Sequence, residues 1–432
     1  MQLTRAATLA LVGALSLPIV TSSPAVAAEG YPCTGIDDET TQSATTVPSI
    51  SYELLGIDRA AQLLAERDIT PGEGVRVAVV DSGVTVGTEP LAPLAVTGLQ
   101  RFGTSEPVVY GHGTNVAGLV AGGEREDGQP TGIAPGAEIV DVRVYDEPND
   151  DGVGGIRQTD VIDAVNWLAA NAEAEGIGVV VTAFDLPPSA AFRKAITALS
   201  ARDVVIVAGS GNRPEVEGQE GYDEYREQKP GENAEDLTFP AGYTDEVFAV
   251  TSTAAGVRVT EGQVADASGS VLLSGAIDAA VPTFGAVTLA PNGATCLIDK
   301  ISTSWAAGVA VGVVALVRSA YPQENADQIE ARLLASASGT LGSPTTATGA
   351  GVLQPVEALT QEFDPARDGD VDDRPREAVA QPAVRAPVAR DRPARGHPGR
   401  CPLVGSVRRC GAGRGAAGAA SAAPASQLTG GG

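Results

Sequence analysis

Three polar residues stand where an apolar segment ends or begins, and together they could activate a nucleophile. Asp81 directly follows an apolar run in "VVDSGV", His112 lies between two glycines in "GHGTNVAG", and Ser304 lies in "STSWAAGVAVG". A histidine can take the proton of a serine hydroxyl, and an aspartate can hold that histidine in the required tautomer and stabilise its cation. The sequence has only one other histidine, His397, in a segment rich in Pro, Arg and Gly.

Each of these residues also has an ordinary structural explanation. An aspartate after a strand is usually a turn or cap residue, and a serine at a helix start is usually an N-cap. A histidine between two glycines is harder to explain by structure alone. The occurrence of all three in one chain therefore favours the catalytic interpretation.

The surrounding pattern predicts an α/β fold that would bring these residues together. Apolar runs rich in β-branched residues predict buried parallel strands, and helical patterns lie between several of them. In such sheets, sites form at the carboxyl ends of the strands. The predicted strands are Val75–Val80, 137–144, 178–183, 204–209 and 246–253, and the predicted helices include 53–67, 114–122, 159–176, 189–202, 304–321 and 326–338. The apolar stretch of helix 304–321 is too short to span a bilayer, so we expect a core helix.

The two ends of the chain differ from the middle. A positive start, an apolar run and small residues at Ala25–Ala27 predict a signal peptide over residues 1–27 and hence export. A polar extension (28–50) precedes the predicted peptidase domain (51–362). Residues 363–432 are rich in Arg, Pro, Gly and Ala, which predicts disorder, although a frameshift of a GC-rich gene is an alternative explanation for this composition.

Charge and cysteine content narrow the partners and the compartment. The net charge is −25, and residues 374–432 hold ten Arg against two acids, about +8, which leaves about −33 for the rest. Such a charge argues against nucleic acid and against an anionic membrane surface. Among the four cysteines, Cys33 and Cys296 lie outside the tail that holds Cys401 and Cys410. Export permits oxidation, so we expect a Cys33–Cys296 disulfide, with two free thiols as the alternative.

The motifs resemble those of subtilisin-like serine proteases, the subtilases. "VAVVDSGV", "GHGTNVAGLVAG" and "STSWAAG" are similar to the three catalytic motifs of that family, in the family's order Asp…His…Ser. "GIAPGAEIVDVRV", "VVIVAGSGN", "FPAGYTDEVFAVTST" and "TGAGVLQPVEAL" also resemble segments of the family. The resemblance covers about residues 50–360. It implies a three-layer fold with a mostly parallel central sheet flanked by helices, and it implies that Asn212 stabilises the oxyanion.

Within the subtilases, the N-terminal region is similar to that of the mycosins, proteases of type VII secretion systems. The likeness lies in a short extension with a cysteine before "ELLGIDRAAQLLAERDITPGEGVRVAVVDSGV". It implies a secreted or cell-envelope protein that serves such a system. We expect no membrane span besides the signal peptide.

Three departures from the family pattern bear on activity. Ser302 replaces the family's glycine before the nucleophile motif and could crowd the turn if that turn needs a positive φ. Gly308 replaces a proline, and Pro187 and Pro188 stand where the substrate-binding strand normally has glycines. An acidic segment follows Asn212, either as a solvated loop or as a border of the substrate cleft.

The sequence thus predicts an exported serine endopeptidase that cleaves peptide or protein substrates through an acyl-enzyme. Ser304 is the expected nucleophile, His112 the base and Asp81 its orienting partner. No cofactor or metal is expected for this chemistry, and no Cys/His cluster has zinc spacing. The alternative is a subtilase-fold scaffold that binds or stabilises a secretion complex.

Overall fold

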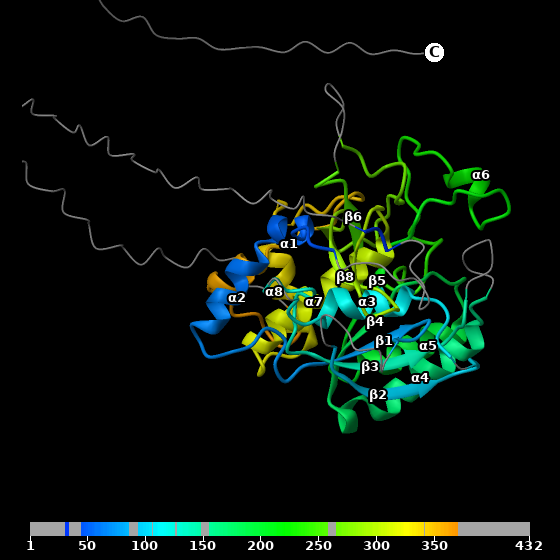
Figure 1. Ribbon diagram of the computed structural model, residues 1–432. Coiled ribbons are helices and arrows are strands. Elements are labelled where there is room, and N and C mark those ends of the chain that lie inside the picture. The colour runs from blue at the N-terminus through cyan, green and yellow to red at the C-terminus, as the bar shows by residue number, and fades with distance from the viewer. Residues whose placement is uncertain are drawn as a thin grey trace, which may run out of the picture. The chain divides into compact units, whose positions relative to one another are not determined.

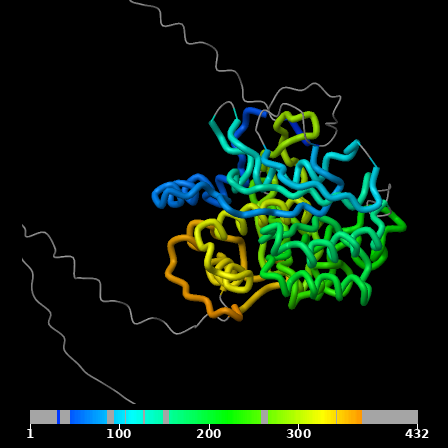
Figure 2. Tube along the Cα trace, turned by 90° about the horizontal axis from the view of Figure 1, so that it is seen from below, coloured from blue at the N-terminus to red at the C-terminus, as the bar shows by residue number. Residues whose placement is uncertain are grey.

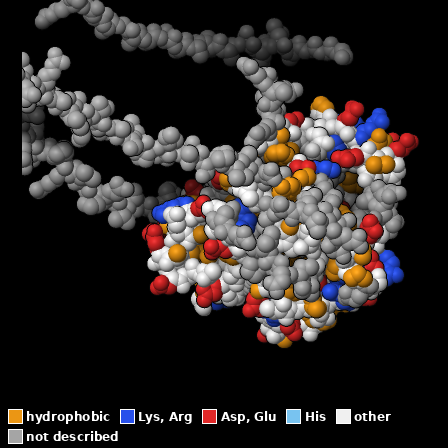
Figure 3. Space-filling view, in the orientation of Figure 1, with side chains coloured by type: hydrophobic (Ala, Val, Ile, Leu, Met, Phe, Trp, Pro, Cys, Tyr) orange, Lys and Arg blue, Asp and Glu red, His pale blue; other side chains and the backbone are white. Residues whose placement is uncertain are grey.

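The computed structural model describes residues 31–33, 45–85, 94–105, 107–125, 128–147, 155–257, 265–340 and 342–369. The predicted signal peptide (1–27) lies outside them. So do Cys401, Cys410 and all of the predicted tail beyond residue 369. Acidic side chains are spread over the described part of the face seen in Figure 3, with basic side chains between them.

A parallel sheet of seven strands runs through the described structure (Figure 1) in the order β2-β3-β1-β4-β5-β6-β7. All of its neighbouring strands are parallel, which confirms the predicted sheet type. The β-branched runs form β1 (Arg76–Asp81), β3 (Glu138–Arg143), β4 (Ile177–Thr182), β5 (Val205–Gly209) and β6 (Phe248–Thr253). The apolar runs of the sequence did not predict the edge strands β2 (Val96–Arg101) and β7 (Ala279–Pro282). Strand β2 is only partly buried and contains a glycine, and β7 has four residues.

Helices cover both faces of the sheet because alternate strand residues point in opposite directions. Val77 and Val79 of β1 pack in one core with helices α3 (His112–Ala121) and α7 (Thr303–Ala320). Ala78 and Val80 pack in the other core, with α4 (Gln158–Glu175) and α5 (Ala190–Ser200). The predicted three-layer subtilisin-like architecture is thereby confirmed.

Helix α7 is the central helix of the first core. Among the described helices it alone is long and apolar enough to cross a membrane, but 78% of that stretch is buried inside the protein. Near its end, Arg318 donates a hydrogen bond to the Gly178 carbonyl and lies 3.6 Å from Asp203. The burial confirms the predicted core helix.

The N-terminal helical pattern forms two helices rather than one. Gly56, with φ 66°, separates α1 (Ile50–Leu55) from α2 (Ile57–Ala65). This left-handed conformation suits glycine and stops α1, which the apolar spacing alone did not reveal.

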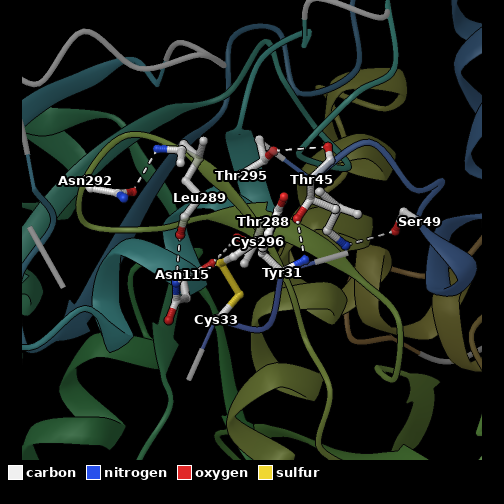
Figure 4. The surroundings of a disulfide bond; sticks show 12 residues. Tyr31, Cys33, Thr45, Ser49, Asn115, Thr288, Leu289, Asn292, Thr295 and Cys296 are labelled. Carbon is white, nitrogen blue, oxygen red and sulfur yellow. Dashed lines mark hydrogen bonds between the residues drawn. A yellow bond between two sulfur atoms is a disulfide. The ribbon is translucent and has the colours of Figure 1, made fainter. Parts of the chain in front are cut away.

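The extension before α1 is fastened to a small hairpin of β8 (Val287–Leu289) and β9 (Thr295–Leu297). Cys33 and Cys296 form the predicted disulfide, with Cα atoms 4.9 Å apart (Figure 4). The Cys33 N–H donates to the Leu297 carbonyl at 3.0 Å, and the Thr45 N–H to the Thr295 carbonyl at 3.2 Å. Cys296 is fully buried, and Tyr31 and Cys33 of the extension pack against it.

The C-terminal part of the described chain packs beside α2. Helix α8 (Ala326–Ser336) begins with a capping box made by Asn325 and Gln328. Figure 2 shows the segment 342–369, in orange, beside α8 in yellow, and it carries α9 (Pro355–Thr360). The short α6 (Tyr222–Tyr225) lies in the acidic segment after Asn212.

Candidate active site

Asp81 ends β1 at the place where the strand order reverses. Strand β1 lies between β3 and β4, so the chain leaves it toward one side of the sheet and continues later on the other. Such a switch point opens a crevice at the carboxyl ends of the strands. The Asp81 carboxylate is fully buried and accepts a hydrogen bond from the Ser82 N–H at 2.7 Å.

His112 begins α3 and points its ring toward Asp81. Its Nδ1 lies 2.9 Å and 3.0 Å from the two carboxylate oxygens. Because an ionised carboxylate only accepts hydrogen bonds, Nδ1 is the donor, and Nε2 of the neutral ring is left as the base. The His112 side chain is 12% exposed, so a substrate can still reach it.

Gly113 explains the second glycine beside His112. A Cβ at this position would lie 2.5 Å from the Gly83 carbonyl oxygen and 3.1 Å from the Asp81 Cβ. The Gly113 N–H also donates to the Ser82 hydroxyl at 3.0 Å. The start of α3 can therefore approach the end of β1 only without a side chain here.

Ser304 lies in the first turn of α7, and the residue that follows it contacts His112. The ring of the next residue, Trp305, has its centroid 4.8 Å from that of the imidazole. The Ser304 hydroxyl, however, bonds the Ser302 hydroxyl at 2.8 Å, and no hydrogen bond of the described residues joins it to His112. The structure thus joins His112 to Asp81 and Ser304 to Ser302, and it brings the neighbour of Ser304, Trp305, against the imidazole.

The backbone at Ser302 does not have the positive φ that would make a side chain crowd the turn. Its φ is −156°, which is extended backbone open to any residue, so a positive φ is not required here. Ser302 is instead the N-cap of α7, and its hydroxyl accepts the Ser304 N–H at 3.3 Å. The condition under which Ser302 would crowd the turn, a positive φ, is therefore not met.

Asn212 follows β5 and faces the same turn. Its Oδ1 accepts the Thr303 N–H at 2.9 Å and lies 3.3 Å from the Thr303 hydroxyl. The amide oxygen is thereby engaged, and the amide N–H groups remain for another acceptor. Asn212 is exposed, so that acceptor can come from a bound substrate.

The acidic segment after Asn212 is held at its base and exposed beyond it. Arg213 makes a buried ion pair with Glu232 at 2.9 Å. It also donates to the carbonyls of Tyr225 and Ser268. Most other residues of the segment are exposed, as expected of a solvated loop.

The remaining departures from the family pattern have local causes. A Cβ at Gly308 would lie 2.9 Å from Leu119 of α3, so the small residue lets α7 and α3 pack closely. After β4, the Leu186 N–H is already paired with the Phe239 carbonyl at 2.8 Å. Pro187 and Pro188 follow with no N–H to offer. This stretch therefore has few backbone donors for a substrate.

Tyr145 belongs to the site and was not found from the sequence. It stands two residues after β3, and its buried hydroxyl donates to Asp81 Oδ1 at 2.9 Å. Polar residues that follow parallel strands gather at the carboxyl edge of the sheet, and this principle could have identified Tyr145. In the sequence alone, an aromatic residue directly after an apolar strand resembles a core residue.

Comparison with known proteins agrees with this geometry. Residues 72–354 match the profile of the subtilase family. Mycosin-3 of Mycobacterium tuberculosis (strain ATCC 25618 / H37Rv) is 29% identical over 368 residues, which cover 79% of this chain and 77% of that protein. M-protease of Shouchella clausii (strain KSM-K16) is 29% identical over 329 residues, 75% of this chain and 73% of that protein.

Solved structures show the same fold. The MycP3 protease from the type VII (ESX-3) secretion system has a TM-score of 0.57 and 24% identity, covering 81% of this chain and 100% of that one. A chain of an intact ESX-5 inner membrane complex has a TM-score of 0.55 and 23% identity, with 86% and 87% covered. With two thirds of the sequence inside the family profile and mycosins and subtilisins among its relatives, the chain belongs to the subtilase family of serine proteases.

Proposed function

We propose that the protein is an exported endopeptidase that hydrolyses peptide bonds through an acyl-enzyme formed on Ser304. One observation carries this assignment: His112 is hydrogen-bonded by Nδ1 to the buried carboxylate of Asp81, beside the start of α7. A histidine held in this tautomer, near the first turn of a helix that carries Ser304, suits acyl transfer.

In the proposed reaction, Ser304 Oγ attacks the carbonyl carbon of the substrate and gives its proton to His112 Nε2. The Asp81 carboxylate stabilises the imidazolium. The oxyanion accepts hydrogen bonds from the Ser304 N–H and the Asn212 amide. His112 then protonates the leaving amine. Water attacks the acyl-enzyme and gives a proton to His112, and Ser304 takes that proton as the acid product leaves.

Labelling with a fluorophosphonate probe tests the nucleophile. The probe phosphonylates an activated serine, with loss of fluoride, so the full chain should be labelled and Ser304→Ala should not. The same variant should lose on the order of 10⁴–10⁶ in peptidase turnover while keeping its thermal unfolding temperature. Normal labelling of Ser304→Ala would assign the nucleophile to another residue.

A role in a type VII secretion system is the finer part of the proposal. It is supported by the similarity to Mycosin-3 and by the N-terminal sequence typical of an exported protein. We place the mature protein in the cell envelope or outside the cell, with cleavage after Ala27 or Ala28. Cell fractionation with N-terminal sequencing of the mature chain checks the location. A protein found in the cytoplasm with residues 1–27 still attached would exclude this location.

A scaffold with weak activity is the second candidate. Two observations favour it: Ser304 is bonded to Ser302 rather than to His112, and Leu186 is already paired with Phe239. A scaffold would bind its complex equally well as Ser304→Ala. Comparing labelling with co-purification of a secretion complex separates the two roles.

A further inference from the structure

The Ser302 hydroxyl touches both groups that Ser304 must use in the reaction. It lies 2.8 Å from Ser304 Oγ and accepts the Ser304 backbone N–H at 3.3 Å. In the reaction proposed above, Ser304 Oγ must donate its hydrogen bond to His112. The Ser304 N–H must donate to the oxyanion instead of to Ser302. The Ser302 side chain therefore bonds both the hydroxyl that would attack and the N–H that would stabilise the oxyanion.

We infer that Ser302 is a positioning residue that holds Ser304 in a resting arrangement and slows acylation. This inference rests on the proposed nucleophile. The hydroxyl, rather than the backbone, is the cause, since φ −156° and ψ 145° at Ser302 are open to every residue. Replacing Ser302 with glycine removes the hydroxyl and leaves the turn unstrained.

The surroundings of the pair make this arrangement stable. Ser304 is 9% exposed, so little water competes for its hydroxyl. Thr303, between the two serines, is held by Asn212, which fixes the backbone of the turn. The two hydroxyls thus face each other on a rigid turn, and a substrate must break both contacts of Ser302 before the attack.

The size of the effect follows from the strength of a hydrogen bond. A neutral hydrogen bond contributes about as much free energy as a tenfold change in rate, about 1.4 kcal/mol. We therefore expect Ser302→Gly to accelerate acylation roughly tenfold. The gain should lie in the maximal rate of acylation and not in the affinity for the probe, because Ser302 acts on Ser304.

Three variants of the full chain separate this role from a structural one. Ser302→Gly and Ser302→Ala both remove the hydroxyl. As an N-cap, glycine costs the helix less stability than alanine does. Ser302→Thr keeps a hydroxyl and should return the rate toward that of the parent chain. The maximal rate of fluorophosphonate labelling is measured for each, with thermal unfolding as the check on folding.

The expected result is faster labelling of the glycine and alanine variants despite equal or lower stability. If Ser302 served only as an N-cap, removing its hydroxyl would change the stability of the protein and leave the labelling rate unchanged. The inference fails if neither the glycine nor the alanine variant is faster than the parent, or if the threonine variant is as fast as the glycine variant. Equal labelling of the parent and Ser304→Ala would instead overturn the proposed nucleophile, so the two failures are distinguishable.

Discussion

The hydroxyl of Tyr145 donates a 2.9 Å hydrogen bond to Oδ1 of Asp81, the oxygen that also accepts the Ser82 N–H and contacts His112 Nδ1. Burial raises the pKa of Tyr145 well above its ordinary value, and the negative charge of Asp81 raises it further. The phenol therefore stays protonated as a donor. It helps to hold the fully buried Asp81 side chain in one orientation.

Tyr145→Phe should lower turnover by about tenfold and leave the Michaelis constant nearly unchanged. A hydrogen bond to a charged group contributes about 1.5–3 kcal/mol, part of which acts through the orientation of His112. Steady-state kinetics on a peptide substrate measure the effect. Tyr321→Phe is the control, since it removes a hydroxyl that bonds Ala358 and Leu359. Equal turnover of both variants and the parent would contradict the assigned role.

Asn212→Ala should lower turnover by about 10²–10³, the usual cost of one oxyanion donor. Asn212→Asp gives a sharper test because its carboxylate can still accept the Thr303 N–H while offering no donor. We expect the aspartate variant to be at least as impaired as the alanine variant. Recovery of activity in Asn212→Asp would show that the contact with Thr303, and not the amide donor, matters.

The fold was predictable because its strong signals are local. Runs such as Val75–Val80 are buried on both faces and rich in β-branched residues, so they read clearly as strands. The edge strand β2 and the break at Gly56 depend on tertiary packing and backbone conformation, which the apolar spacing does not reveal. The disulfide partner of Cys33 was predictable by elimination, but the burial of Cys296 was not.

The site was predictable as a set of residues and less so as an arrangement. Asp81 and His112 lie in contact as their positions after a strand and at a helix start suggested. The Ser302–Ser304 bond depends on a side-chain rotamer within one turn, and no sequence pattern specifies it. The role of Tyr145 depends on neighbouring strands in the sheet, which are far apart in the chain.

Reduction of the Cys33–Cys296 disulfide should destabilise the protein by a few kcal/mol. The bond closes a loop with a sequence separation of 263, for which the chain-entropy model gives an upper value of about 5.6 kcal/mol. Equilibrium unfolding in denaturant, with and without reductant, measures the loss. A Cys33→Ser and Cys296→Ser double variant should match the reduced parent and show no further response to reductant. An unchanged midpoint in the reduced parent would contradict the prediction.

Stability should fall as the pH rises from about 4 to about 8, in part because of two half-buried carboxyl groups, those of Glu330 and Asp278. Burial raises the pKa of Glu330 on α8 to about 8, and Asp278 and Asp327 nearby raise it as well. Burial also raises the pKa of Asp278 to about 7, against the opposing bond from the Ala249 N–H. Both values exceed those of the unfolded chain, about 4.3 and 3.9. The native state therefore binds more protons than the unfolded state across this interval and loses stability as they dissociate.

Glu330→Gln should remove much of this loss, because glutamine is neutral at every pH. The variant should unfold at a higher temperature than the parent at pH 9 and show little or no gain at pH 5, where Glu330 is protonated. Thermal unfolding at several pH values between 4 and 9 measures the difference. Glu362→Gln, at an exposed position two residues after the end of α9, is the control and should follow the parent curve. The same gain for Glu330→Gln at pH 5 and pH 9 would show that packing, and not the charge of the Glu330 carboxylate, governs stability here.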